Sequence, residues 1–166
     1  MLQIVEALSD ICYSQIMKVY AQSNLRYGNA TYPRLSQSLR ELSAEQDFYA
    51  YLRDFFRTSR AMYALWVVEG EYKSALRLEP YEDGFLLAGL ETAPDARNKG
   101  FAKALVRGTL DAVWKRYSQP VYSHIEKTNL PSLAVHRSCG FSCIREDADY
   151  IDGTHRTDAG TWIWKK

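Results

Sequence analysis

The chain has 166 residues, of which 46% are hydrophobic, and a formal net charge of +1. A chain of this size can bury a core without disulfides or metals, and its balanced charge excludes a general affinity for nucleic acid or acidic membranes. The three cysteines show no disulfide-like pattern, and no apolar run is long enough to cross a bilayer. The first residues also lack the basic start of a signal peptide. These observations predict one cytoplasmic domain over residues 1–166.

The first third of the chain predicts one strand and two helices. Residues 2–7 look like a short strand, and Ser9 is placed to cap a helix that follows. Residues 26–34 contain glycine, asparagine and proline and predict a loop. Ser43-Ala44-Glu45-Gln46 fits a capping box, so we expect the second helix to begin there.

The middle of the chain predicts consecutive β-hairpins. Residues 61–68 are rich in β-prone side chains, Glu69-Gly70-Glu71 supplies a turn, and residues 72–79 alternate between apolar and polar. A second turn near Glu82-Asp83-Gly84 leads into an apolar strand over 85–92.

A helix follows that strand after a short loop. Its apolar residues and its charged residues each recur at helical spacing on opposite faces from Ala102 to Lys115. The first turn of such a helix presents free backbone N–H groups, and Gly100 allows close approach of a ligand. The stretch 97–103 therefore predicts an anion-binding turn, reinforced by Arg97, Lys99 and Lys103, or else an ordinary strand-to-helix connection.

The last third completes a mixed sheet. Residues 121–127 follow a strand and a crossover helix, so this strand is expected to lie parallel to 85–92. A short helix over 131–139 ends at Gly140, and strands over 142–151 and 161–164 are joined through Asp152-Gly153. The predicted fold class is α/β (α+β), with helices packed on a mixed sheet.

Two motifs give this order of elements a specific resemblance. Arg97, Gly100 and Ala102 match the signature of Arg or Gln, two residues, Gly, one residue, Gly or Ala. Asn129 followed by the helix that ends in Gly140-Phe141 matches a second marker at a suitable spacing. The chain resembles the GCN5-related N-acetyltransferase family over nearly its whole length.

The resemblance implies a fold and a co-substrate. It implies a mostly antiparallel sheet of about seven strands with about four helices, in which the parallel strands 85–92 and 121–127 splay apart around coenzyme A. It also implies acetyl-CoA as the acyl donor, with its pyrophosphate held by the backbone of 97–103 and its pantetheine arm in the gap between the two strands. The expected binding residues are Leu90, Thr92, Arg97, Asn98, Lys99, Gly100, Phe101, Ala102, Lys103, Asn129 and Ser132.

The resemblance also suggests catalytic residues. Direct acetyl transfer needs a group that takes a proton from the amine, and Glu91 is the first choice because it lies close to the expected thioester; Glu79 and Glu126 are alternatives. His136 occupies the place where the family often has a tyrosine and is a candidate acid for the leaving thiolate. The competing interpretation gives Glu91 and His136 structural or surface positions. No metal site is expected.

The predicted function is acetyl-CoA-dependent N-acetylation of a primary amine on a small molecule or peptide, by direct transfer in a ternary complex. Two alternatives stay open: a non-catalytic acyl-CoA-binding module, and an acetyltransferase for protein lysines or N-termini. Tyr27 and Tyr32 are candidates for the acceptor pocket. The expected partners are acetyl-CoA and an amine, without nucleic acid or membrane, in a monomer or homodimer.

Overall fold

The structure, a computed structural model, describes residues 1–166 and contains a seven-stranded sheet with strand order β1-β2-β3-β4-β5-β9-β6. A separate two-stranded sheet pairs β7 with β8. The strands are β1 (Leu2–Val5), β2 (Met62–Val68), β3 (Glu71–Tyr81), β4 (Gly84–Thr92), β5 (Val121–Glu126), β6 (Ser142–Arg145), β7 (Ala148–Asp149), β8 (His155–Arg156) and β9 (Ala159–Trp164). The helices are α1 (Tyr13–Val19), α2 (Ala21–Thr31), α3 (Gln37–Phe55), α4 (Phe101–Tyr117) and α5 (Leu130–Ser138), with 3-10 turns at Leu8–Asp10 and Pro94–Ala96.

The sheet confirms the predicted mixed, mostly antiparallel architecture. Every pairing is antiparallel except that of β4 with β5, which is parallel as predicted. Only Phe85–Val121 and Leu86–Tyr122 pair across β4 and β5. The two strands therefore separate after Leu86, and the β5-facing edge of β4 has no strand partner from Ala88 to Thr92.

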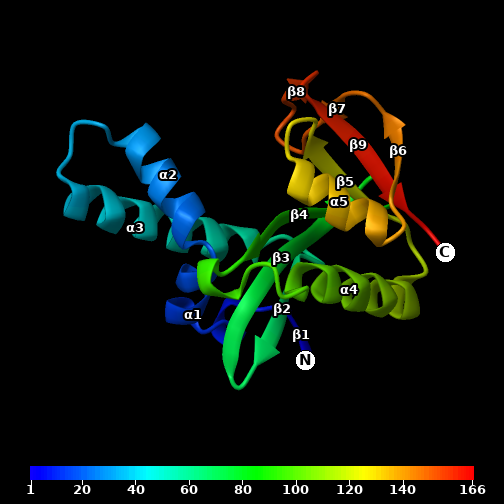
Figure 1. The fold of residues 1–166 in the computed structure, drawn as a ribbon, viewed down its shortest axis with the longest axis horizontal. Coiled ribbons are helices and arrows are strands. Elements are labelled where there is room, and N and C mark those ends of the chain that lie inside the picture. Colours follow the sequence, from blue (N-terminus) through cyan, green and yellow to red (C-terminus); the bar gives the residue numbers. More distant parts are fainter.

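Two apolar clusters lie on opposite faces of the sheet. Leu105, Leu110 and Val113 of α4 pack with strand residues such as Leu76 and Phe85 in one cluster. Residues of α1 and α3, including Ile16 and Leu52, pack with Tyr63 and Leu65 in the other. Figure 1 shows α4 running along the β1–β3 part of the sheet, with α5 beside β5 and β9. The predicted amphipathic face of the helix after residue 101 is thereby confirmed.

Helices α2 and α3 form a hairpin that projects from one side of the molecule (Figure 1). The loop predicted for 26–34 was wrong, because α2 continues to Thr31. Gly28 lies where the two helices cross: a Cβ there would be 3.0 Å from the Arg40 carbonyl oxygen. The glycine that indicated a loop is instead a close-approach position between helices.

The start predicted for the second helix was also wrong. The helix α3 begins at Gln37, with Ser36 at the N-cap position, so Ser43-Ala44-Glu45-Gln46 lies inside it. The added N-terminal turns pack on α2 and bury little: Leu39 and Leu42 are about half exposed. Because these apolar residues are not buried on one face, the hydrophobic periodicity of the sequence does not reveal that the helix begins before residue 43. The structure has five α-helices where about four were expected, and none has the length and apolar composition to cross a membrane.

Two further boundaries differ from the prediction. Ser9 lies in the 3-10 turn, and α1 begins only at Tyr13 after Cys12. The strand predicted over 142–151 divides into β6, which pairs with β9, and β7, which pairs with β8 in a separate sheet. The chain then turns at Tyr150–Gly153, where the Gly153 N–H donates to the Tyr150 carbonyl, and returns as β8.

Candidate active site

The turn between β4 and α4 carries a run of free backbone donors. The six N–H groups from Asn98 to Lys103 donate no hydrogen bond within the chain, and the first helical bond begins with Ala104 N–H to the Gly100 carbonyl at 3.0 Å. No side chain caps this end of α4. Because the positive end of the helix dipole adds to these donors, the turn favours an anion such as a phosphate.

The conformation of the turn explains its residues. Gly100 has φ of 80° and Asn98 has φ of 61°, so both lie in the left-handed region, where glycine and asparagine are tolerated best. No atom lies within 4 Å of the Cβ position of Gly100. The N–H groups therefore face open space that a ligand can occupy.

A cavity of about 620 Å³ lies against this turn. We call it the loop cavity. It extends from the turn to the edge of β4 that β5 leaves unpaired, and α5 forms its other wall. Its lining residues are Gln22, Arg26, Leu90, Glu91, Thr92, Ala96, Arg97, Asn98, Gly100, Phe101, Ala102, Lys103, Asn129, Pro131, Ser132 and Val135.

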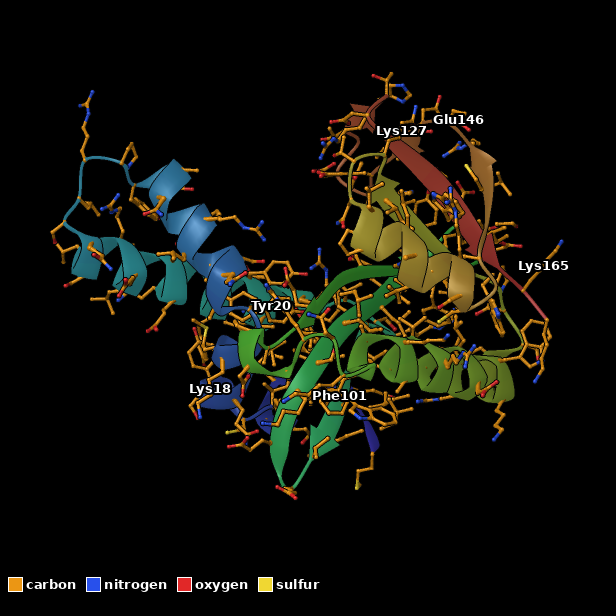
Figure 2. The ribbon with its side chains drawn as sticks, viewed as in Figure 1. Lys18, Tyr20, Phe101, Lys127, Glu146 and Lys165 are labelled. Atoms are coloured by element: carbon orange, nitrogen blue, oxygen red, sulfur yellow. The ribbon has the colours of Figure 1, made fainter.

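Most residues predicted to bind the cofactor meet in this cavity. Of the eleven expected positions only Lys99 does not line it. Asn129 also stabilises the start of α5, because its Oδ1 accepts a hydrogen bond from the Ser132 N–H at 3.2 Å. Phe101 is labelled in Figure 2 at the beginning of α4, beside the sheet.

The basic side chains of the turn differ in direction. Arg97 donates from Nη1 to Gln22 Oε1 at 2.8 Å and from Nε to the Thr92 carbonyl at 3.3 Å, so it joins the loop to α2 and β4. Lys99 donates from Nζ to the Asp95 carbonyl at 3.0 Å. Lys103 makes no such bond and lines the cavity. The backbone N–H groups of the turn and Lys103 are therefore free to contact an anion.

Glu91 of β4 stands between two cavities. It lines the loop cavity and also a second one of about 440 Å³ between α2, α3 and the sheet, which we call the helix cavity. Its carboxylate accepts a hydrogen bond from Ser23 Oγ of α2, and Arg97 Nη2 lies 4.0 Å from its Oε2. With 21% of its side chain exposed, Glu91 can receive a proton from a group in either cavity.

The helix cavity is polar and aromatic. It is lined by Tyr20, Ser23, Asn24, Tyr27, Ala44, Asp47, Phe48, Tyr51, Arg77, Gly89 and Glu91. Figure 2 places Tyr20 where α1 meets α2, and its hydroxyl donates to the Gly89 carbonyl at 2.6 Å. Of the two tyrosines expected near an acceptor, Tyr27 lines this cavity, and both Tyr27 and Tyr32 donate to Asp47 Oδ2.

A third cavity, of about 460 Å³, adjoins the helix cavity, since both include Tyr51, Arg77 and Gly89. We call it the sheet cavity; it also contains Glu79 and His124. Burial raises the pKa of the Glu79 carboxyl, while the charge of Arg77 opposes that shift. The other alternative base, Glu126, is half exposed, pairs with Arg156 at 3.1 Å and lines none of the three cavities.

His136 has a buried position. Its side chain lies among core residues with the residue 1% exposed, its ring packs edge-on against Phe141, and it lines none of the three cavities. Nδ1 lies 2.8 Å from the Ser132 carbonyl, which can only accept, so the proton of the neutral ring is on Nδ1. Burial lowers the pKa of His136 and favours this neutral form. The ring thus has no free N–H for a leaving group, which supports the structural interpretation of His136.

Sequence reasoning missed the contribution of α2 to the loop cavity. Gln22 and Arg26 line it and are one helical turn apart. Their i, i+4 spacing would place both side chains on one face of a helix, but the loop predicted over 26–34 separates them. No group of three or more His, Cys, Asp or Glu side chains is arranged to hold a metal ion.

Comparison with known proteins places this geometry in a family. The model of the acetyltransferase (GNAT) family matches residues 28–141, which is more than half of the chain. The chain belongs to the GNAT acetyltransferase family. This confirms the resemblance inferred from Arg97, Gly100 and Ala102. The matched residues include the turn with the free N–H groups and the part of β4 that lines the loop cavity and the helix cavity.

Solved structures support the GNAT fold at low sequence identity. The paia N-acetyltransferase of Thermoplasma acidophilum, in complex with coenzyme A, aligns with a TM-score of 0.67 and 13% identity over 100% of this chain and 99% of that chain. The ribosomal-protein-S18-alanine N-acetyltransferase of Escherichia coli aligns with a TM-score of 0.60 and 17% identity over 98% and 92%.

A curated relative matches a shorter segment. The mycothiol acetyltransferase of Saccharomonospora viridis is 34% identical over 61 residues. That segment makes up 37% of this GNAT chain and 20% of the relative, so the likeness concerns a part of that protein.

Proposed function

We propose that this chain is an acetyl-CoA-dependent N-acetyltransferase that transfers the acetyl group directly to a primary amine of a small molecule or peptide. The observation that carries the proposal is the pairing of the six free N–H groups with a cavity that Glu91 joins to a second one. A donor in the loop cavity and an amine in the helix cavity would meet at Glu91. This arrangement suits a ternary complex, and it needs no covalent enzyme intermediate.

The chain's own residues fit coenzyme A. The N–H groups from Asn98 to Lys103 would hold the pyrophosphate, with Lys103 adding positive charge. The unpaired edge of β4 from Ala88 to Thr92 would bond the pantetheine arm, opposite Asn129 and Ser132. Membership of the GNAT family supports this assignment, as does the neighbour solved with coenzyme A.

Glu91 would act as the base. It would accept a proton from the amine as the N–C bond forms and the C–S bond of the thioester breaks. Backbone N–H groups at the free edge of β4 would stabilise the negative charge on the carbonyl oxygen. CoA would leave as the thiolate and take its proton from solvent, because His136 has no free N–H to give.

The first test concerns the turn. We expect Gly100→Glu to abolish acetyl-CoA binding in calorimetry, because its carboxylate would occupy and repel anions from the open space that the N–H groups face. Gly70→Glu is the matched control: Gly70 has φ of 79° with nothing within 4 Å of its Cβ position, but it lies in the turn between β2 and β3.

The two variants share the backbone strain and the added charge, so only the position differs. Unchanged affinity of Gly100→Glu would refute the assignment of the turn. Thiol release from acetyl-CoA against a panel of amines and peptides then tests the activity. Binding without release for any amine would identify a non-catalytic acyl-CoA-binding module instead.

A further inference from the structure

Arg77 is the one charged side chain shared by the helix cavity and the sheet cavity. It extends from β3 across Gly89 of β4, and its guanidinium lies 5.2 Å from the ring centroid of Tyr51. A Cβ built on Gly89 would come within 2.5 Å of Arg77 Nη1. The absence of a side chain at residue 89 therefore leaves the space that the guanidinium occupies.

The guanidinium makes no hydrogen bond of normal length and angle within the chain, although its charge opposes the rise that burial causes in the pKa of the Tyr63 hydroxyl. Its nearest carboxylate is that of Glu79, with Nε to Oε1 at 3.8 Å, which is too long for a hydrogen bond. Arg77 Nε is buried without a partner, although 28% of the side chain is exposed toward the cavities. A guanidinium carries five N–H donors, and leaving them unmatched in a partly buried site is costly.

The carboxylates of the helix cavity differ from Arg77 in this respect. Asp47 accepts hydrogen bonds from Tyr27 and Tyr32, and Glu91 accepts one from Ser23. Among the charged side chains that line this cavity, Arg77 alone lacks a hydrogen-bond partner. An incoming group with acceptor oxygens would therefore find its donors at Arg77.

We propose that Arg77 selects an acceptor amine that also carries a carboxylate. The planar fork of a guanidinium matches the two oxygens of a carboxylate, and the pair gains strength because both groups are charged. This inference rests on the proposed acetyltransferase function: the amine end would lie at Glu91 and the carboxylate end at Arg77. The substrate class is then a small amino acid or another amino-carboxylate.

The positions along β4 limit the size of that substrate. Arg77 Nη1 lies where a side chain of residue 89 would begin, and Glu91 is two residues further on the same strand. Two residues of extended chain span at most about 7 Å, and Arg77, Gly89 and Glu91 all line the helix cavity. An amine and a carboxylate separated by a few bonds can therefore reach both groups at once.

The test uses matched pairs of acceptors on the intact chain. The α-amino acids, β-alanine and γ-aminobutyrate are each compared with their carboxamides in thiol release from acetyl-CoA. For at least one pair we expect kcat/KM to favour the carboxylate by about tenfold or more, since a site built for hydrogen bonds rejects a ligand that lacks them. If every carboxamide has the same kcat/KM as its carboxylate, the wild-type chain alone overturns the proposal.

Variants then locate the preference. We expect Arg77→Gln to remove the preference for the carboxylate while acetyl-CoA affinity stays unchanged, and Arg77→Lys to restore part of it through charge alone. Arg57→Gln is the control, because it removes the same charge from a side chain that lies beyond the end of α3 and is 73% exposed. A preference that survives in Arg77→Gln would also overturn the proposal.

Thermal stabilisation separates this inference from the proposed function. Each amino-carboxylate and its carboxamide are added to the wild-type chain with and without CoA, and a ligand that binds the folded state raises Tm. Loss of acetyl-CoA binding would reject the acetyltransferase, and the shift by carboxylates would still be measurable. If no amino-carboxylate raises Tm above its carboxamide, Arg77 does not select carboxylates.

Discussion

Glu91 owes its position to contacts that are distant in sequence. Its carboxylate is held by Ser23, 68 residues earlier, and by the nearby charge of Arg97. These contacts fix the group at the boundary of two cavities, although the residue itself belongs to an ordinary strand. Its role as the base is therefore open to a direct kinetic test.

We expect Glu91→Gln to lower kcat/KM by about 10²- to 10⁴-fold and to remove the acidic limb of the pH–rate profile, because the amide cannot take the proton. The measurement is thiol release over a range of pH with an accepted amine. Glu126→Gln serves as the control, because Glu126 lies on β5, half exposed and paired with Arg156. An acidic limb that is unshifted in Glu91→Gln would point to another base.

At this scale the sequence predicts some residues and not others for a physical reason. The proposed binding role of Gly100, Ala102 and their neighbours depends on a backbone turn that is local in sequence, so their spacing reveals them. The proposed role of Arg77 and the contact of Ser23 with Glu91 depend on neighbours that only the fold supplies, and the local patterns of the two residues are those of a strand and a helix. The candidate role of His136 as an acid did not take account of its burial, which depends on Phe141 and the core.

At the scale of elements, the hairpin of α2 and α3 forms the far wall of the helix cavity. Its crossing point depends on Gly28, whose Cβ position lies 3.0 Å from the Arg40 carbonyl oxygen and 3.3 Å from Ala44 Cβ. The sequence suggested a loop here because glycine usually interrupts helices. The structure shows the other use of glycine, which is to let two backbones approach.

We expect Gly28→Val to destabilise the chain by about 1–3 kcal/mol, because the added methyl groups must push α2 away from α3. Chemical denaturation followed by circular dichroism measures the change. Asn29→Val places the same β-branched side chain on the exposed neighbouring position of α2 and should have a smaller effect. Equal stability of the two variants would show that the crossing tolerates a side chain.

At the scale of the whole molecule, the succession of strands from β2 to β5 along the chain and the parallel pair were predictable, since periodicity and turn residues mark these strands. The strands near the C-terminal end of the chain were less predictable. The register shift in β6 arises in its pairing with β9, and β7 pairs with β8 in a separate sheet; no local pattern shows either pairing.

The centre of the sheet depends on very few backbone pairs. Six residue pairs join β5 to β9, but only two join β4 to β5. We expect CoA to slow amide hydrogen exchange in β5 and in the second half of β4, because a ligand between the strands would restrain their separation. The Gly100→Glu variant, under the same conditions, should show no protection. Equal exchange in wild type with and without CoA would contradict this coupling.

The short contact between β4 and β5 also limits how the chain can be stabilised. Substitutions that extended this pairing beyond Leu86 would add backbone hydrogen bonds and raise the melting temperature. They would also occupy the strand edge on which the proposed acyl donor depends. Heat resistance and donor affinity are therefore opposed at this position, and a selection for thermal stability alone is expected to yield variants that have lost the ligand.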